Sequence, residues 1–148
     1  MTGGDEVAGS LVVPDASVLL KWVLKSDDEP DGDRALQLKA AWLADACHVL
    51  VPSLWLYEVG NVVGLKQPDD AVALMTAMAA LGLPEAAPSV FMAGALRLMK
   101  DRRVTFYDAA YHATALAEDG VFVTADAAYL RKARAEGGVM HLADWTLA

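Results

Sequence analysis

The sequence predicts an α/β domain in which a short central sheet of four to five mostly parallel strands is flanked by helices. Short apolar runs alternate with longer segments of helical character along the chain. Strands that alternate with helices pair in parallel, because each crossover helix must cover a face of the sheet. The chain has 148 residues, of which 55% are hydrophobic. These values suit one domain with one sizeable core.

The first half of the chain is predicted to hold two strands. The apolar runs at 11–13 and 48–51 are too short for helices and suit strands that are buried on both faces. Pro52 suits the first turn of a helix. In order, the expected elements are a strand at 11–13, helices at 18–24 and 33–46, a strand at 48–51, and a helix from Pro52 to about 65.

The second half is punctuated by residues that are typical of helix ends. Gly82 is typical of a helix C-terminus, and Ser89 and Thr105 are typical N-caps. In order, the expected elements are a helix from 67 to 81, an irregular or very short strand at 83–88, a helix from Ser89 to 100, a charged loop at 101–103, a helix from Thr105 to 120, a strand at 121–124, a helix at 126–135 and a last strand at 139–142.

Composition narrows the class of protein. No apolar stretch approaches the ~20 residues that span a bilayer, so no membrane association is expected. Residues 1–10 are expected to form a flexible polar leader, without the cationic start and apolar stretch of a signal peptide, ahead of a single domain at 11–148. Cys47 is the only cysteine, which excludes an internal disulfide and a cysteine metal site. A cytoplasmic location is the simplest expectation.

The formal net charge of -8 argues against non-specific binding of nucleic acid, which usually needs a basic face. Part of this charge lies in one acidic loop, interpreted as a solvated turn. Its acids are Asp27, Asp28, Glu29, Asp31 and Asp33. The remaining acids carry the functional hypothesis.

Four acidic residues draw attention by their position: three follow or adjoin predicted strand-to-helix junctions, and one lies within an otherwise apolar helix. Asp15 and Asp126 follow strands, at the sheet edge where parallel α/β proteins bind ligands. Asp108 lies three residues after Thr105, in the pattern of a capping box. A capping role, worth ~1 kcal/mol, explains each of these three when it is taken alone. If the fold instead gathers them with Glu58, only a divalent cation could hold the four charges together.

Glu58 is harder to explain as a structural residue. Its helix, 54–63, carries apolar side chains around nearly its whole circumference, which predicts a largely buried helix. Glu58 and Asn61 share one face of it. An ionised carboxylate there is costly unless it is paired or bound to a metal. The alternative is that this face is the narrow solvent side of the helix, and the helix alone does not decide between them.

Basic residues form two clusters close in sequence to Asp108 and Asp126. Solvated helix faces explain them adequately, yet an RNA backbone would have to lie near these acids. The candidates for RNA contact are Arg102, Arg103, Arg131 and Lys132. His112, one turn after Asp108, is interpreted as a packed or surface histidine. The tryptophans are interpreted as core or interface residues.

Four segments together resemble one family. They are residues 13–22, 51–62, 105–111 and 123–126, which contain Asp15, Glu58, Asp108 and Asp126 in turn. In this order and spacing the chain resembles PIN-domain proteins, and among those the VapC-type toxin ribonucleases of bacterial toxin–antitoxin pairs. The resemblance covers nearly all of the chain after the leader. It implies a three-layer PIN-like fold.

The resemblance also implies a site and partners. Asp15, Asp108 and Asp126 would bind the metal and Glu58 would complete the catalytic set, while Ser17 and Thr124 would support it and Asn61 would line the pocket. Oxygen-only ligands suit Mg²⁺ or Mn²⁺. The implied activity is a metal-dependent endoribonuclease with an RNA substrate, a cognate antitoxin and a homodimeric state. The helices that carry Trp22, Trp55 and residues 75–78 are candidate interfaces, although core packing explains them equally well.

Two other functions compete with this one. A phosphotransferase with an aspartyl nucleophile after the first strand would need a second Asp two residues later, where Ser17 stands. A non-catalytic PIN-like interaction module would use the acids only as helix caps.

Overall fold

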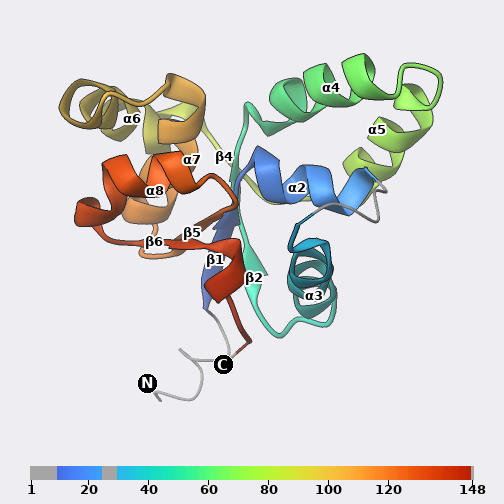
Figure 1. Cartoon of the computed structure of the whole chain (residues 1–148), viewed down its shortest axis with the longest axis horizontal. Coiled ribbons are helices and arrows are strands. Elements are labelled where there is room, and N and C mark those ends of the chain that lie inside the picture. Colours follow the sequence, from blue (N-terminus) through green and yellow to red (C-terminus); the bar gives the residue numbers. More distant parts are fainter. Residues whose placement is uncertain (1–9, 25–29, 148) are drawn as a thin grey trace.

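A four-stranded parallel sheet lies at the centre of the protein, in a computed structural model that describes residues 10–24 and 30–147 (Figure 1). The strand order is β2-β1-β5-β6, and all three neighbouring pairs are parallel. The strands are β1 (Leu11–Pro14), β2 (His48–Val49), β5 (Val121–Thr124) and β6 (Val139–His141). The predicted α/β class, with a parallel sheet between helices, is confirmed. Most of the expected leader, residues 1–9, and three acids of the loop, Asp27, Asp28 and Glu29, lie outside the described residues.

The run predicted as one strand at 48–51 is two strands in two sheets. Its first part, β2, pairs with β1, and the amide of Leu50 donates to the carbonyl of Val12 at 3.1 Å. The chain then passes to a second parallel sheet of β3 (Val51–Pro52) and β4 (Glu85–Ala86). Pro52 therefore lies in a strand, and the prediction that it starts a helix is wrong. The very short strand expected within 83–88 is β4.

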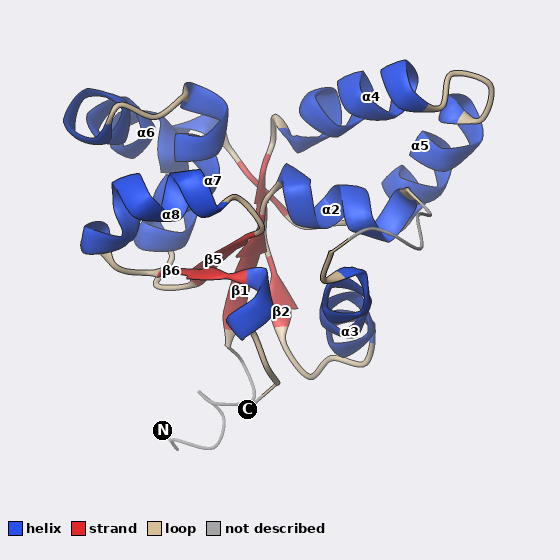
Figure 2. Ribbon diagram, viewed as in Figure 1, coloured by secondary structure: helices blue, strands red, loops and turns tan. Residues whose placement is uncertain are grey.

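Seven α-helices are present in the described residues and flank the sheet. They are α2 (Ala16–Val23), α3 (Gly32–Leu43), α4 (Trp55–Lys66), α5 (Ala71–Ala80), α6 (Pro88–Arg102), α7 (Phe106–Ala117) and α8 (Ala127–Ala133). Helices α6, α7 and α8 lie on one side of the strands and α2 to α5 on the other, with the strands between them (Figure 2). Two 3₁₀ turns, η1 (Arg134–Glu136) and η2 (Leu142–Asp144), follow α8 and β6.

Helix α6 differs from its prediction at both ends. It begins at Pro88, with Ala87 as the N-cap, so Ser89 lies inside the helix and does not cap it. A proline at the first helical position loses no hydrogen bond, which makes a polar cap dispensable. The helix continues through Arg102 and ends where Arg103 adopts a left-handed conformation with φ 56°. Part of the expected charged loop is therefore helical.

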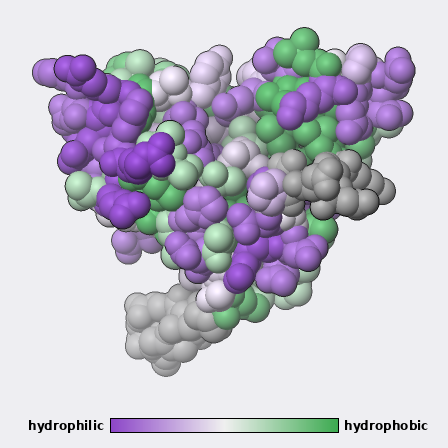
Figure 3. Space-filling view, in the orientation of Figure 1, coloured by the Kyte–Doolittle hydropathy of each residue, from purple (hydrophilic) through white to green (hydrophobic). Residues whose placement is uncertain are grey.

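Helix α4 is not largely buried, which corrects the prediction made from its apolar composition. Only Trp55, Val59 and Val63 are buried, whereas Tyr57 and Leu65 are each 76% exposed. Val72 of the neighbouring α5 is 82% exposed. Figure 3 shows hydrophobic surface over α4 and α5. Composition alone could not separate this surface from core.

The core fills the space between the sheet and the helices. Val13, Phe122 and Val123 of the two central strands are fully buried. Trp22 stacks on Trp42 with ring centroids 6.0 Å apart, and its indole nitrogen donates to the carbonyl of Ala35 at 2.8 Å. Among the described residues, none of the helices combines the length and apolar character needed to cross a membrane.

Candidate active site

The site lies where β1 and β5 end side by side. Pro14 pairs with Val123 in the parallel register of these two strands, and the amide of Asp15 donates to the carbonyl of Val123 at 3.1 Å. Parallel strands end at one edge of a sheet. The loops that carry Asp15 and Asp126 therefore leave the sheet together, as the sequence predicted.

Asp15 is held by three donors. Its Oδ1 accepts hydrogen bonds from the Ser17 hydroxyl and from the amide of Val18, the latter at 3.2 Å. Its Oδ2 accepts a hydrogen bond from the Thr124 hydroxyl at 2.5 Å. The Val18 contact makes Asp15 the N-cap of α2, so the capping interpretation is correct. The other two contacts fix the carboxylate in one orientation, and the side chain is only 4% exposed.

Ser17 and Thr124 also connect Asp15 to the loop of Asp126. The amide of Ala125 donates to the Ser17 hydroxyl at 3.0 Å, and the amide of Asp126 donates to the Thr124 hydroxyl at 3.0 Å. Asp126 in turn caps α8, because its Oδ1 accepts from the amides of Ala128 and Tyr129. Two hydroxyl groups thus join the loops after neighbouring strands into one polar unit.

Asp108 lies in the first turn of α7, opposite this unit. Its amide donates to the N-cap hydroxyl of Thr105 at 3.2 Å, as the capping pattern predicted. Asp108 and Asp126 both line a pocket of about 260 Å³. Arg103 and Lys132 line the same pocket. The pocket therefore brings two of the predicted acids together with two of the predicted RNA-contact residues.

Glu58 reaches the site from α4. Its Oε1 accepts a hydrogen bond from the Tyr111 hydroxyl at 2.9 Å. Tyr111 is fully buried and lies on α7, one turn after Asp108. Tyr111 was not among the site residues predicted from the sequence. Its signal was a tyrosine in a buried helix, since a buried hydroxyl needs a partner.

The acids share one negative environment. Burial raises the pKa of Asp15 to about 7, with a smaller contribution from the charge of Asp108. Burial also raises the pKa of Glu58, and Asp108 again adds to the effect. The pKa of Asp108 is raised by burial and then by the charge of Asp126. Asp108 is thus electrostatically coupled to each of the other three acids.

The donor set fits a hard divalent cation in its chemistry. All four candidates offer carboxylate oxygens, which Mg²⁺ and Mn²⁺ prefer, and their repulsion is what a bound cation relieves. Within residues 10–24 and 30–147, however, no three His, Cys, Asp or Glu side chains form a ready-made cation site. The fit is therefore one of ligand type and charge, not of preformed geometry.

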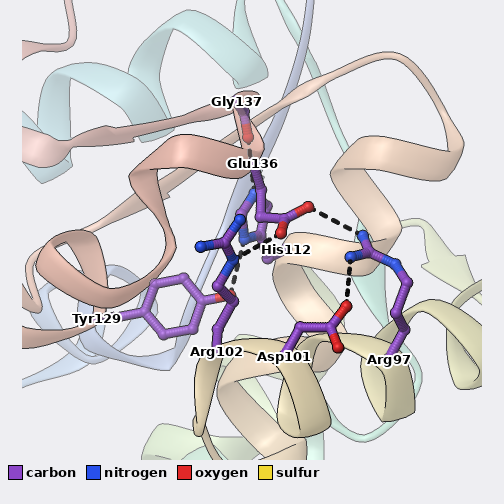
Figure 4. Close-up of polar contacts among 7 residues, drawn as sticks. All are labelled: Arg97, Asp101, Arg102, His112, Tyr129, Glu136 and Gly137. Carbon is purple, nitrogen blue, oxygen red and sulfur yellow. Dashed lines mark hydrogen bonds and ion pairs between the residues drawn. The ribbon is translucent and has the colours of Figure 1, made fainter.

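The basic candidates separate into three groups. Lys132 lines the acid pocket beside Arg103, and its Nζ donates to the Arg103 carbonyl at 3.2 Å. Arg102 instead forms an ion pair with Glu136 at 2.7 Å, as does Arg97 at 3.1 Å (Figure 4). Arg131 lines a different pocket. The structure therefore brings only two of the four basic candidates to the acids.

The remaining candidates lie as follows. His112 is fully buried, with Nε2 2.8 Å from the Gly137 carbonyl and Nδ1 2.7 Å from the Tyr129 hydroxyl (Figure 4). Since a carbonyl only accepts, Nε2 carries the proton and Nδ1 accepts from Tyr129. His112 is thus the packed histidine that was expected. Asn61 is exposed, and no hydrogen bond joins it to the acids in the described part of the chain.

Comparison with known proteins bears on the family and the fold. The family model for the PIN domain matches residues 12–135. A chain in a toxin-antitoxin complex from Klebsiella pneumoniae is similar in structure, with a TM-score of 0.64 and 17% identity over 88% of this chain and 97% of that one. The crystal structure of PAE2754 from Pyrobaculum aerophilum has a TM-score of 0.60 and 22% identity over 91% and 92% of the two chains. No curated protein matches the sequence.

Proposed function

Because the chain belongs to the PIN-domain family, whose members are generally nucleases, we propose that it is an endoribonuclease that depends on Mg²⁺ or Mn²⁺. The observation that carries the proposal is that three acids come together at the carboxyl edge of the parallel sheet. Ser17 and Thr124 join the loops of Asp15 and Asp126, and Asp108 lines one pocket with Asp126. Carboxylates gathered at this edge support a cation site.

Asp15 and Asp108 are the proposed principal ligands, and Asp126 completes the site. A divalent cation bound there would lower the pKa of a water and withdraw charge from the phosphate. Ser17 and Thr124 are supporting residues, because their hydroxyls fix both oxygens of Asp15. Hydrogen bonds to ligand carboxylates of this kind typically matter 10–100-fold for affinity or activity.

Glu58 is the proposed general base. Tyr111 occupies its Oε1, which leaves Oε2 to accept the proton of the attacking water. A carboxylate with a raised pKa is a better proton acceptor near neutral pH than an ordinary one. Tyr111 is therefore a positioning residue, since it acts on the reaction only through Glu58.

Arg103 and Lys132 are the proposed contacts to the RNA backbone at the cut. They line the pocket that contains Asp108 and Asp126, so a phosphate between them would lie beside the acids. The positive charges of these two side chains let a chain with a net charge of -8 hold RNA at this point.

We further propose that the protein is the toxin of a toxin–antitoxin pair, that it works in the cytoplasm, and that it forms a homodimer. The support for the toxin assignment is the similarity of fold to a chain of the Klebsiella complex. Trp22 and Trp55, considered above as interface residues, are buried within the chain. The exposed apolar side chains of α4 and α5, such as Tyr57 and Val72, are better candidates for contact with a partner.

The test is cleavage of single-stranded RNA and of matched DNA, with Mg²⁺, Mn²⁺ or EDTA. The expected result is metal-dependent cleavage of RNA that falls at least ~100-fold in Asp15→Asn and in Asp108→Asn. Asp70→Asn, at an exposed position on another loop, is the matched control. Undiminished cleavage in both site variants would defeat the assignment. Absence of cleavage by the unmodified protein, with antitoxin binding intact, would favour the non-catalytic module.

A further inference from the structure

A second pocket borders α8 on the helix face opposite the acid pocket. The acid pocket uses Ala128, Tyr129 and Lys132, whereas the second uses Ala127, Leu130, Arg131 and Arg134 of the same region. At 3.6 residues per turn these sets point in nearly opposite directions. The second pocket has a volume of about 590 Å³, within the range of pockets that hold small ligands.

Two guanidinium groups, those of Arg131 and Arg134, line this pocket. Neither Arg131 nor Arg134 has an ion pair or a side-chain hydrogen bond within residues 10–24 and 30–147. Arg97 and Arg102 differ, because both are committed to Glu136 (Figure 4). The two positive charges of Arg131 and Arg134 outnumber the one negative charge in the lining, that of Asp144. The pocket is therefore a locally basic site on an acidic protein.

The opposite wall of the pocket comes from β6 and η2. Val139 and Met140 supply apolar surface, together with Leu130 of α8. His141 Nδ1 accepts a hydrogen bond from the amide of Ala143 at 2.9 Å. In the neutral ring the proton is then on Nε2, which makes His141 a donor. The lining thus combines a flat apolar surface, an imidazole and two guanidinium groups.

This pocket adjoins the acids along the edge of the sheet. His141 pairs with Thr124 in the register of β5 and β6, and neighbouring strands lie about 4.8 Å apart. Thr124 donates directly to Asp15. Ala127, at the rim of the pocket, follows Asp126 in sequence. The two pockets therefore lie on either side of α8, near the same end of the sheet.

We propose that this pocket binds a nucleotide of a single-stranded RNA next to the bond that is cut. Arg131 and Arg134 contact its phosphate, and the base lies against Met140 and its apolar neighbours. The His141 ring can stack on the base or donate from Nε2, as histidines do in single-strand recognition. Asp144 offers an acceptor for an amino or 2′-hydroxyl group. The choice of RNA as the occupant rests on the proposed function.

The direct test follows methionine methyl groups by NMR in the full chain, without divalent metal. The probe is a pool of randomised single-stranded RNA of about ten nucleotides. We expect the methyl signal of Met140 to move and saturate. Met75 of α5 and Met92 of α6 do not line this pocket and serve as internal controls. An unmoved Met140 signal at saturating RNA would overturn the proposal.

The second measurement is RNA affinity as a function of salt. Arg131→Gln and Arg134→Gln are each expected to weaken binding about tenfold and to lower the salt slope by about 0.7. Lys66→Gln, the same charge change at the exposed end of α4, should leave both unchanged. Arginine variants that bind with the affinity and salt slope of the unmodified protein would also overturn the proposal.

Two further arms separate the possible failures. If the unmodified chain cleaves RNA but the Met140 signal does not move, only the proposal that this pocket binds a nucleotide is refuted. If the chain neither cleaves nor binds RNA, the proposed function is refuted, and with it the choice of RNA as the occupant of the pocket. A Met140 signal that moves with poly-glutamate but not with RNA would assign the pocket to an acidic peptide. Movement with 5′-CMP as well as RNA would support a nucleotide site.

Discussion

The hydroxyl of Tyr111 donates a hydrogen bond to Oε1 of Glu58 at 2.9 Å and thereby ties α7 to α4. These helices belong to the two groups that stand on opposite sides of the strands (Figure 1). The space-filling view shows a hollow between the two groups (Figure 3). The bond therefore sets where the carboxylate of Glu58 lies relative to Asp108, which is on the same helix as Tyr111.

Replacing Tyr111 by Phe tests this relationship. The hydrogen bond from Tyr111 lowers the pKa of Glu58 against the larger effect of burial, so its loss raises that pKa further. We expect the acidic limb of the pH–rate profile to move to higher pH and kcat to fall about tenfold. Tyr57→Phe, which removes the hydroxyl of an exposed ring on α4, the helix of Glu58, should do neither. An unshifted acidic limb would remove Glu58 from the role of base.

Asp15→Asn is expected to stabilise the metal-free protein. The folded-state pKa of Asp15 is about 7, against an ordinary value of 3.8, so folding favours its protonated form. Stability is then highest below the ordinary value and falls as the pH rises towards the folded value. At about pH 8 the amide should raise the free energy of unfolding by about 1–3 kcal/mol. Urea unfolding in EDTA measures this difference.

The same pair of proteins tests the cation site. Mg²⁺ should raise the melting temperature of the unmodified protein, because a ligand that binds only the folded state stabilises it. The variant should gain little, and its stability should exceed that of the unmodified protein only when metal is absent. Asp70→Asn is the control for a change of surface charge. An equal response to Mg²⁺ in all three would show that Asp15 holds no cation.

His112 should make stability depend on pH near neutrality. Burial lowers its pKa below the ordinary 6.5, outweighing the opposing effect of the Gly137 contact and the charge of Glu136. The unfolded chain therefore binds a proton more readily, and stability should fall as the pH is lowered through about 6.5. Urea unfolding between about pH 7.5 and 5.5 should show this slope in the Asp15→Asn protein, in which the opposite titration of Asp15 is absent. It should be absent in His112→Gln and retained in His48→Gln, at an exposed strand residue.

Lys132→Gln separates binding from chemistry at the acid pocket. Because Lys132 offers a point charge beside Asp108 and Asp126, its loss should raise KM for RNA several-fold and lower the salt slope by about 0.7. The melting temperature should stay nearly constant, since the side chain makes only an exposed contact to the Arg103 carbonyl. A changed kcat with an unchanged salt slope would argue against a phosphate contact.

Local pattern was enough to predict part of the site. Asp15 and Asp126 follow short apolar runs, and parallel pairing obliges the ends of such runs to meet. Thr105 and Asp108 form a local capping pattern that the helix realises. In each case the physical cause acts over a few residues or through the geometry of one sheet.

Contacts between distant segments were beyond local pattern. Tyr111 and Glu58 are 53 residues apart, and Arg102 and Glu136 are 34 apart. Nothing near Arg102 in sequence indicates that its charge is committed. The prediction of a largely buried α4 was wrong for a related reason, because an exposed apolar face has the same composition as one packed on a core. The prediction of one strand at 48–51 was wrong because the chain passes from one sheet to the other at Leu50. Hydropathy does not distinguish one continuous strand from two short ones.

The Thr124–Asp15 bond spans 109 positions of the chain and has a consequence for synthesis. The opening strand β1 stays without its central neighbour until the ribosome has synthesised β5 (Val121–Thr124), and α8 with Asp126 emerges later still. Translation products that stop before this point lack half of the polar unit. On the proposed function, translation products that stop before β5 would therefore lack the cation site and would not cut RNA.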